Sequence, residues 1–218
     1  MAHRSIRCAL LRPLALLGAL ASLSVTKPLF AQVLGNSGDA VFGAERLFGV
    51  RHERLELENS SVAKATTISF GTSERLLPHN SARLGFDYLA ARKFSVGGAL
   101  GFSSGNGEGP VPVAEVHGQT FLLVGRVGFL HMFGHVFGFW PRGGLTYRST
   151  SLENGSDWSD FGLNLEIMFP IAIAPHFGFL TGLSFDHAFT GSYDPPTGPE
   201  RDLHLQSISW QFGLFGWI

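Results

Sequence analysis

Residues 119–146 read QTFLLVGRVGFLHMFGHVFGFWPRGGLT, and this stretch decides which fold the rest of the chain can adopt. It is long and apolar enough for a membrane-spanning helix, which needs about 20 mainly apolar residues. It also contains two arginines, two histidines, one proline and six glycines. Glycine and proline are the poorest helix formers, so the stretch does not favour a helix.

At a period of two, the same residues separate into two faces. Large apolar side chains occupy 121, 123, 127 and 129, and the alternate positions hold Leu122, Val124, Arg126 and Gly128. After a turn at Gly134-His135 the alternation resumes, with Phe137, Phe139, Leu145 and Tyr147 opposite Gly138, Arg142, Gly144 and Thr146. This pattern predicts a β-hairpin with one large apolar face, which must be buried in a core or in lipid.

The N-terminus has the features of a secretory signal peptide. A basic segment with His3, Arg4 and Arg7 precedes the apolar run LALLGALASLSV at 14–25. Cleavage is predicted after Ala31, with Ala21 as the alternative, which leaves 32–218 as one domain. The single cysteine, Cys8, lies in the leader, so the mature chain has no disulfide.

The composition suits a protein in contact with lipid. The 218 residues include 28 Gly and 20 Phe, only 15% are charged, and the net charge is −1. This charge argues against a nucleic-acid partner, because phosphate binding needs a basic surface. The length suits one all-β domain after removal of the leader.

The same alternation recurs along the rest of the chain. Further strands are predicted at 39–57, 82–91, 94–102, 161–169, 177–185 and 207–214. In the first of these, Phe48 and Val50 share a face with Arg46, while Glu45 shares the other face with Leu47, so a bulge is expected. Polar loops are predicted at 58–81, 103–117, 151–159 and 190–202, and the first of them contains a short β-prone piece at 66–70.

Together the pattern gives eight strands whose connections are alternately long and short. We therefore predict a closed, antiparallel, up-and-down transmembrane β-barrel, because a strand edge cannot be left facing lipid. Both ends of the mature domain would lie on the short-turn, periplasmic side. An eight-stranded barrel is just wide enough to be filled by side chains.

The alternation assigns residues to each face. The lumen is predicted to hold a polar network of Asp87, Arg126, Arg142, Asn164, Glu166, Asp186 and Gln211. The lipid-facing residues are predicted to include Phe121, Phe129, Phe137, Phe139, Leu163, Leu165, Ile167, Phe179 and Phe212. Tyr147 and Trp217 are assigned to the interfacial aromatic belt.

The chain resembles the small OmpA-like or opacity-like outer-membrane barrels of Gram-negative bacteria. The features that carry the resemblance are the leader, the eight amphipathic strands, the segment GFDYLAARKFSVGGALGF (85–102) and the aromatic end SWQFGLFGWI (209–218). This resemblance implies location in the cell outer membrane and insertion by the barrel-assembly machinery. That machinery reads a terminal Phe or Trp, whereas Ile218 follows Trp217 here.

The function expected from these observations is structural or adhesive, with outer-membrane lipid as a partner and the loops as the surface for an extracellular ligand. No cofactor, metal or catalytic residue is assigned: His131 and His135 flank the turn but give too few ligands for zinc.

The sequence leaves three alternative functions open. The lumen charges could line a narrow ion or proton pore. A lipid-modifying enzyme could use Asp186 and His187 at the outer rim, although no hydroxyl nucleophile follows two residues later. A soluble secreted β-barrel could hide the phenylalanines inside and bind an apolar ligand, but its outer surface would normally carry more lysine and glutamate.

Overall fold

The computed structural model describes residues 34–58, 62–70, 82–108 and 115–218, and the predicted leader 1–31 lies outside these ranges. All regular structure in the described part is β. Its strands are β1 (Ala40–Leu57), β2 (Ala63–Phe70), β3 (Arg83–Ala91), β4 (Phe94–Glu108), β5 (Glu115–Phe129), β6 (His131–Phe133), β7 (Phe137–Leu152), β8 (Asp157–Ala174), β9 (Phe177–Asp194) and β10 (Arg201–Trp217). Within these ranges, no helix is long and apolar enough to cross a membrane.

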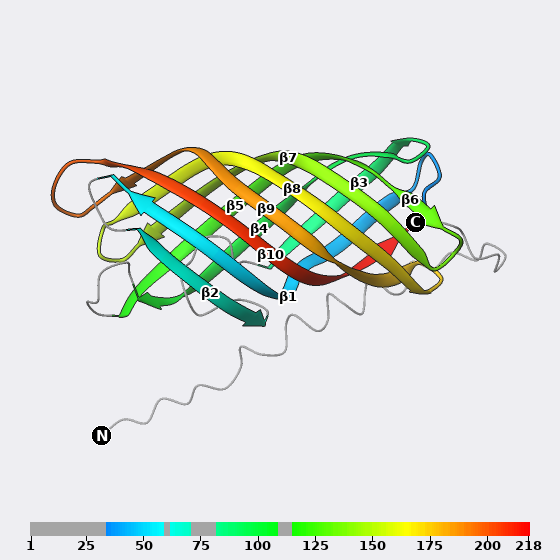
Figure 1. The fold of residues 1–218 in the computed structure, drawn as a ribbon, viewed down its shortest axis with the longest axis horizontal. Coiled ribbons are helices and arrows are strands. Elements are labelled where there is room, and N and C mark those ends of the chain that lie inside the picture. Colours follow the sequence, from blue (N-terminus) through cyan, green and yellow to red (C-terminus); the bar gives the residue numbers. More distant parts are fainter. Residues whose placement is uncertain (1–33, 59–61, 71–81, 109–114) are drawn as a thin grey trace, which may run out of the picture. The chain divides into compact units, whose positions relative to one another are not determined.

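The strands form one closed antiparallel sheet. Neighbours in the sheet follow chain order from β3 to β10, and β1 pairs with β3 on one edge and with β10 on the other. Figure 1 shows the tilted strands running side by side, with red β10 next to blue β1. The predicted all-β, up-and-down barrel is confirmed.

The ten strand segments occupy eight positions in the wall. β2 pairs with residues 48–55 of β1, and β3 pairs with residues 40–45, so the two follow one another along the same edge of β1. In the same way, β6 continues the line of β5 along β7. The eight positions agree with the eight strands predicted.

The predicted loops were too long. Residues 63–70, assigned to a loop, form β2, and β4, β5, β8 and β9 extend into the predicted loops as far as Glu108, Glu115, Asp157 and Asp194. The reason is that backbone pairing continues beyond the apolar band, where the alternation of side chains no longer marks a strand. The remainder of the second loop, 109–114, lies outside the described residues.

Three short turns, at 92–93, 134–136 and 175–176, lie at one end of the barrel together with the ends of the domain. There Ala40 and Ile218 exchange two backbone hydrogen bonds of 3.0 Å. An apolar cluster fills the lumen at this end, formed by Leu34, Val41, Leu89, Leu130, Trp140, Met168, Leu180, Phe215 and Trp217.

Trp217 corrects the prediction of an interfacial tryptophan. It is 4% exposed and its ring stacks on Phe215, with centroids 5.4 Å apart, inside the barrel. Trp217 has the same parity as the inward-facing Gln211, and it pairs with the inward-facing Val41. The alternation of inward and outward side chains in β10 continues to its last residue, and it therefore places the Trp217 ring inside the barrel. Tyr147, by contrast, faces outward and is 44% exposed.

Candidate functional site

The barrel interior is the richest cluster of polar side chains in the described structure. All seven residues predicted for the lumen lie there, and none is more than 4% exposed. The strands place them by alternation: Glu166 of β8 pairs with Arg142 of β7, and Asn164 pairs with Asp186 of β9. Their burial means that each charge must find its partner within the protein.

Four arginines and four carboxylates form a central network at mid-height. Arg126 donates two hydrogen bonds of 2.8 Å to Glu45, and it also contacts Asp87. Arg142 lies 2.7 Å from Glu45 and 2.6 Å from Glu166. Glu45 and Glu166 are thus shared between arginines from different strands.

Two further arginines complete this layer. Arg83 donates to Glu45 at 2.7 Å and also to Glu166, and Arg46 lies 3.1 Å from Asp186. The four positive charges are balanced by Glu45, Asp87, Glu166 and Asp186. Because an unpaired buried charge is strongly unfavourable, the balance explains how so many ions are tolerated in so narrow a space.

Neutral groups and two more ion pairs extend the network. Asn164 donates to Asp186 at 2.8 Å, and Gln211 donates to Glu166 at 3.3 Å. The pairs Arg148 with Asp160 and Arg51 with Glu53 are also buried. Each of these two ion pairs has no net charge, like the central network.

A bulge in β1 supplies two consecutive residues to the network. The pairing of Ala44 with Leu214 is followed by that of Phe48 with Phe212, so residues 45–47 stand opposite Gly213 alone. Arg46 has a φ of 58°, in the left-handed region, and this turns its side chain inward beside that of Glu45. The bulge predicted from the sequence is therefore present.

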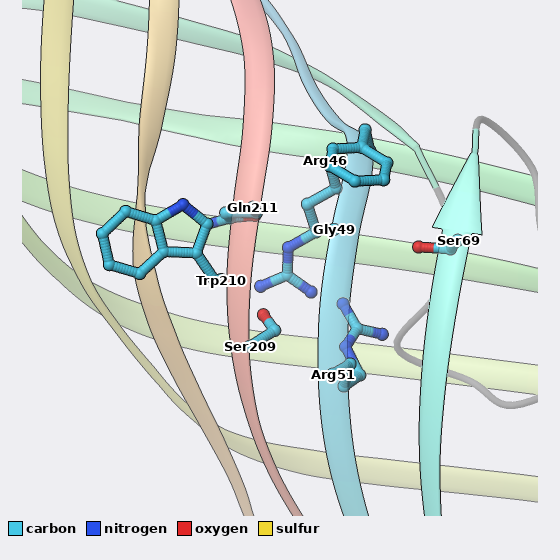
Figure 2. Close-up of a pocket in the computed structure, with 8 residues that line it drawn as sticks. Arg46, Gly49, Arg51, Ser69, Ser209, Trp210 and Gln211 are labelled. Carbon is cyan, nitrogen blue, oxygen red and sulfur yellow. The ribbon is translucent and has the colours of Figure 1, made fainter.

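A small hollow lies beside the bulge, on the inner side of β1. Figure 2 shows the guanidinium groups of Arg46 and Arg51 near one another, with the Ser209 hydroxyl of β10 beside them. Gly49 lines this hollow, and a Cβ at Gly49 would come within 2.6 Å of the Trp210 carbonyl oxygen.

The sequence analysis did not assign seven of the buried ionic residues to the lumen: Glu45, Arg46, Arg51, Glu53, Arg83, Arg148 and Asp160. Arg83 and Arg148 share their parity with Asp87 and Arg142, so alternation alone could have found them. Glu45 and Arg46 could not be found in this way, because adjacent residues of a regular strand face opposite sides.

The outer surface is apolar. Of the nine residues predicted to face lipid, seven are 37–46% exposed, and Phe139 and Leu163 are half-buried between their neighbours on the outer face. Rings pack against each other across adjacent strands, as between Phe137 and Phe169 with centroids 5.9 Å apart. The phenylalanine face is thus outside, opposite to the arrangement that a soluble ligand-binding barrel requires.

The candidate catalytic pair does not come together. Asp186 faces the lumen and bonds to Arg46, whereas His187 faces outward between Phe185 and Phe189. His131 packs edge-on against Phe133, and His135 is exposed in the turn. Neither histidine belongs to a group of three metal-ligating side chains in the described residues.

No protein-family model matches the chain, and no curated protein matches its sequence. Solved structures, in contrast, match the chain in fold. Neisserial surface protein A is 11% identical, with 83% of this chain and 97% of that chain covered and a TM-score of 0.52. The outer membrane protein OprG from Pseudomonas aeruginosa is 14% identical, with 86% and 99% covered and a TM-score of 0.50.

These identities are low enough that the comparison concerns the fold alone. The expected resemblance is confirmed at that level, and the narrower OmpA-like or opacity-like assignment stays a prediction. The chain has the fold of the small, eight-stranded β-barrels found among bacterial outer-membrane proteins.

Proposed function

We propose that this chain is an integral outer-membrane β-barrel whose lumen is closed by side chains and whose outer end serves a structural or recognition role. The observation that carries the proposal is the inversion of polarity: phenylalanine and leucine cover the outside, and arginine and carboxylate fill the inside. Lipid is the solvent that makes this distribution favourable, because it stabilises an apolar exterior and demands a closed strand ladder.

Two groups of lumen side chains at different heights support the proposal of a closed lumen. The apolar cluster around Trp140, Leu180 and Phe215 occupies the short-turn end, and the ion network around Glu45 and Glu166 occupies the middle. An ion crossing the barrel would have to displace buried ion pairs, and leaving a buried charge without its partner is strongly unfavourable. We therefore favour a plug over a pore.

The outer ends of the strands are the proposed recognition surface. They continue as paired strands beyond the apolar band, with outward Ser149 and Ser151 on β7 and Asp157 and Ser159 on β8. Paired strands hold such side chains in fixed positions, which suits binding of an extracellular ligand better than long mobile loops. Outer-membrane lipid and the barrel-assembly machinery are the other proposed partners. We propose no enzymatic activity.

Fractionation combined with heat-modifiability tests the location. The full chain would be expressed in a Gram-negative host, and outer-membrane fractions would be run on SDS gels with and without boiling. We expect the protein in that fraction, with faster migration of the unboiled sample. A protein in the soluble periplasm with no shift in migration would overturn the proposal.

Planar-bilayer recording tests the plug. Purified barrel should insert without steady conductance, whereas Arg142→Ala combined with Glu166→Ala, which removes one cation and one anion together, should raise conductance. Steady ion flow through the wild-type barrel would show a pore instead. If the variant stays heat-modifiable but still shows no conductance, the network does not close the lumen.

A further inference from the structure

Four outward-facing side chains line up across four neighbouring strands near the outer end of the barrel. His187 of β9 pairs with Gln206 of β10, Gln206 pairs with Arg54 of β1, and Arg54 pairs with Lys64 of β2. We call these four residues the basic row. Adjacent strands lie about 4.8 Å apart, so the row extends over about 14 Å of the surface.

The basic row lies at the upper edge of the apolar surface. Two rows below it, Leu183, Trp210, Val50 and Ile68 are paired in the same way and are 40–64% exposed. Between them lies a mixed row of Phe185, Ile208, His52 and Thr66. The side chains thus change from apolar to basic over about 13 Å along the strands, as expected where hydrocarbon gives way to lipid headgroups.

The row carries more positive than negative charge. Arg54 and Lys64 stand directly opposite each other, an arrangement that is unfavourable between like charges unless an anion is present. Arg54 forms an exposed ion pair with Glu56. No carboxylate among the described residues forms an ion pair with Lys64, and the buried Nδ1 of His187 has no hydrogen-bond partner there.

Among the residues that the structure describes, this charge lies on one side of the barrel. On β4, β5, β7 and β8, the first outward polar residues beyond the apolar stretch are Ser104, Gln119, Ser149 and Ser159, all uncharged. A general preference for cations at the membrane surface would not single out β1 and β2. The localisation points to a specific anionic ligand.

We propose that the basic row binds the phosphate of an anionic glycolipid headgroup in the outer leaflet. Arg54 and Lys64 supply charged hydrogen-bond donors for phosphate oxygens, Gln206 and His187 supply further polar contacts, and the apolar rows below accommodate the acyl chains. This inference rests on the proposed location in the outer membrane. It adds a defined lipid-binding site on one face of the barrel.

The test uses the full barrel, purified in detergent and verified as heat-modifiable. Native mass spectrometry would compare binding of bis-phosphorylated lipid A with binding of the same lipid after enzymatic removal of its phosphates. Wild-type protein should retain the phosphorylated lipid at least about tenfold better, because both cations of the row attract the phosphate groups. Equal binding of the two lipids would overturn the proposal.

Variants then locate the site. Arg54→Gln with Lys64→Gln should remove most of the phosphate-dependent binding, and the charge-preserving Lys64→Arg should keep it. Arg92→Gln, an exposed cation in a turn at the opposite end, is the matched control and should bind like wild type. Loss of binding in the control as great as in the Arg54→Gln, Lys64→Gln double variant would place the binding elsewhere.

Competition with inorganic pyrophosphate separates a lipid site from a site for free phosphate. Pyrophosphate at millimolar concentration should not displace the lipid, because it lacks acyl chains; complete displacement would contradict a lipid headgroup as the ligand. A protein that is not heat-modifiable would refute the membrane location itself. A heat-modifiable protein without phosphate-dependent binding would refute only the basic row.

Discussion

Glu45 and Arg46 are consecutive in the chain, and both side chains lie inside the barrel, 2% and 4% exposed. Glu45 contacts Arg83, Arg126 and Arg142, while Arg46 reaches Asp186 on the other side of the bulge. The bulge therefore connects β1, the strand at which the sheet closes, to β3, β5, β7 and β9.

Arg126→Ala should destabilise the barrel strongly. It would leave parts of Glu45 and Asp87 buried without their cation, and breaking a buried ion pair costs about 3–5 kcal/mol. Urea unfolding in phospholipid vesicles would measure the change. The matched control is Arg92→Ala in an exposed turn, which should stay within about 0.5 kcal/mol of wild type. Equal unfolding midpoints for the two variants would contradict the structural role of the network.

The pair of Arg148 and Asp160 allows a double-mutant cycle, since the two residues stand opposite each other on β7 and β8. Arg148→Met and Asp160→Leu should each destabilise the barrel by about 3 kcal/mol, because each leaves an uncompensated charge. The double variant should lose clearly less than the sum, by about 1–3 kcal/mol, when unfolding free energies are compared. Additive losses would mean that the two charges do not interact.

Gly144 and Gly125 should respond oppositely to alanine. A Cβ at Gly144 would lie 2.1 Å from the Gly125 carbonyl oxygen, whereas a Cβ at Gly125 would meet nothing within 4 Å. Gly144→Ala should therefore lower the unfolding midpoint, and Gly125→Ala should leave it unchanged or raise it slightly through lower chain entropy. Similar midpoints for both variants would argue against close backbone packing at Gly144.

Leu165→Arg tests the lipid-facing assignment. Leu165 is 44% exposed on the outer face of β8, near the middle of the strand. An arginine there should cost about 2–4 kcal/mol in vesicles, whereas Ser151→Arg, outward near the end of β7, should cost about 0–1 kcal/mol. If the two substitutions had equal effects on vesicle unfolding, Leu165 would not lie at the membrane midplane.

Strict alternation made much of the interior predictable. Asp87, Arg126 and Asp186 come two residues after Gly85, Val124 and Ser184, and a regular strand has no freedom to turn them outward. Closure was predictable as well, because a chain with this apolar face cannot leave an edge unpaired in lipid.

Other features depended on interactions between distant segments. Trp217 was assigned to the outside from its place at a strand end, but pairing with Val41 holds it inside. The strand β2 carries no strong apolar alternation, and it is ordered by hydrogen bonding to β1. The order in β2 cannot be read from a local window of sequence, whereas the parity that Trp217 shares with Gln211 could have placed its ring inside the barrel.

By itself, the sequence determined the number of wall positions, the sense of each regular strand and the apolar exterior, because these follow from a side-chain period of two. Only the tertiary structure decided the partners of each charge. Ion pairs such as Arg46 with Asp186 join residues that are 140 positions apart, and their meeting depends on the bulge, on strand register and on closure of the sheet. The basic row has the same origin, since Arg54 and Lys64 become neighbours only through the pairing of β1 with β2.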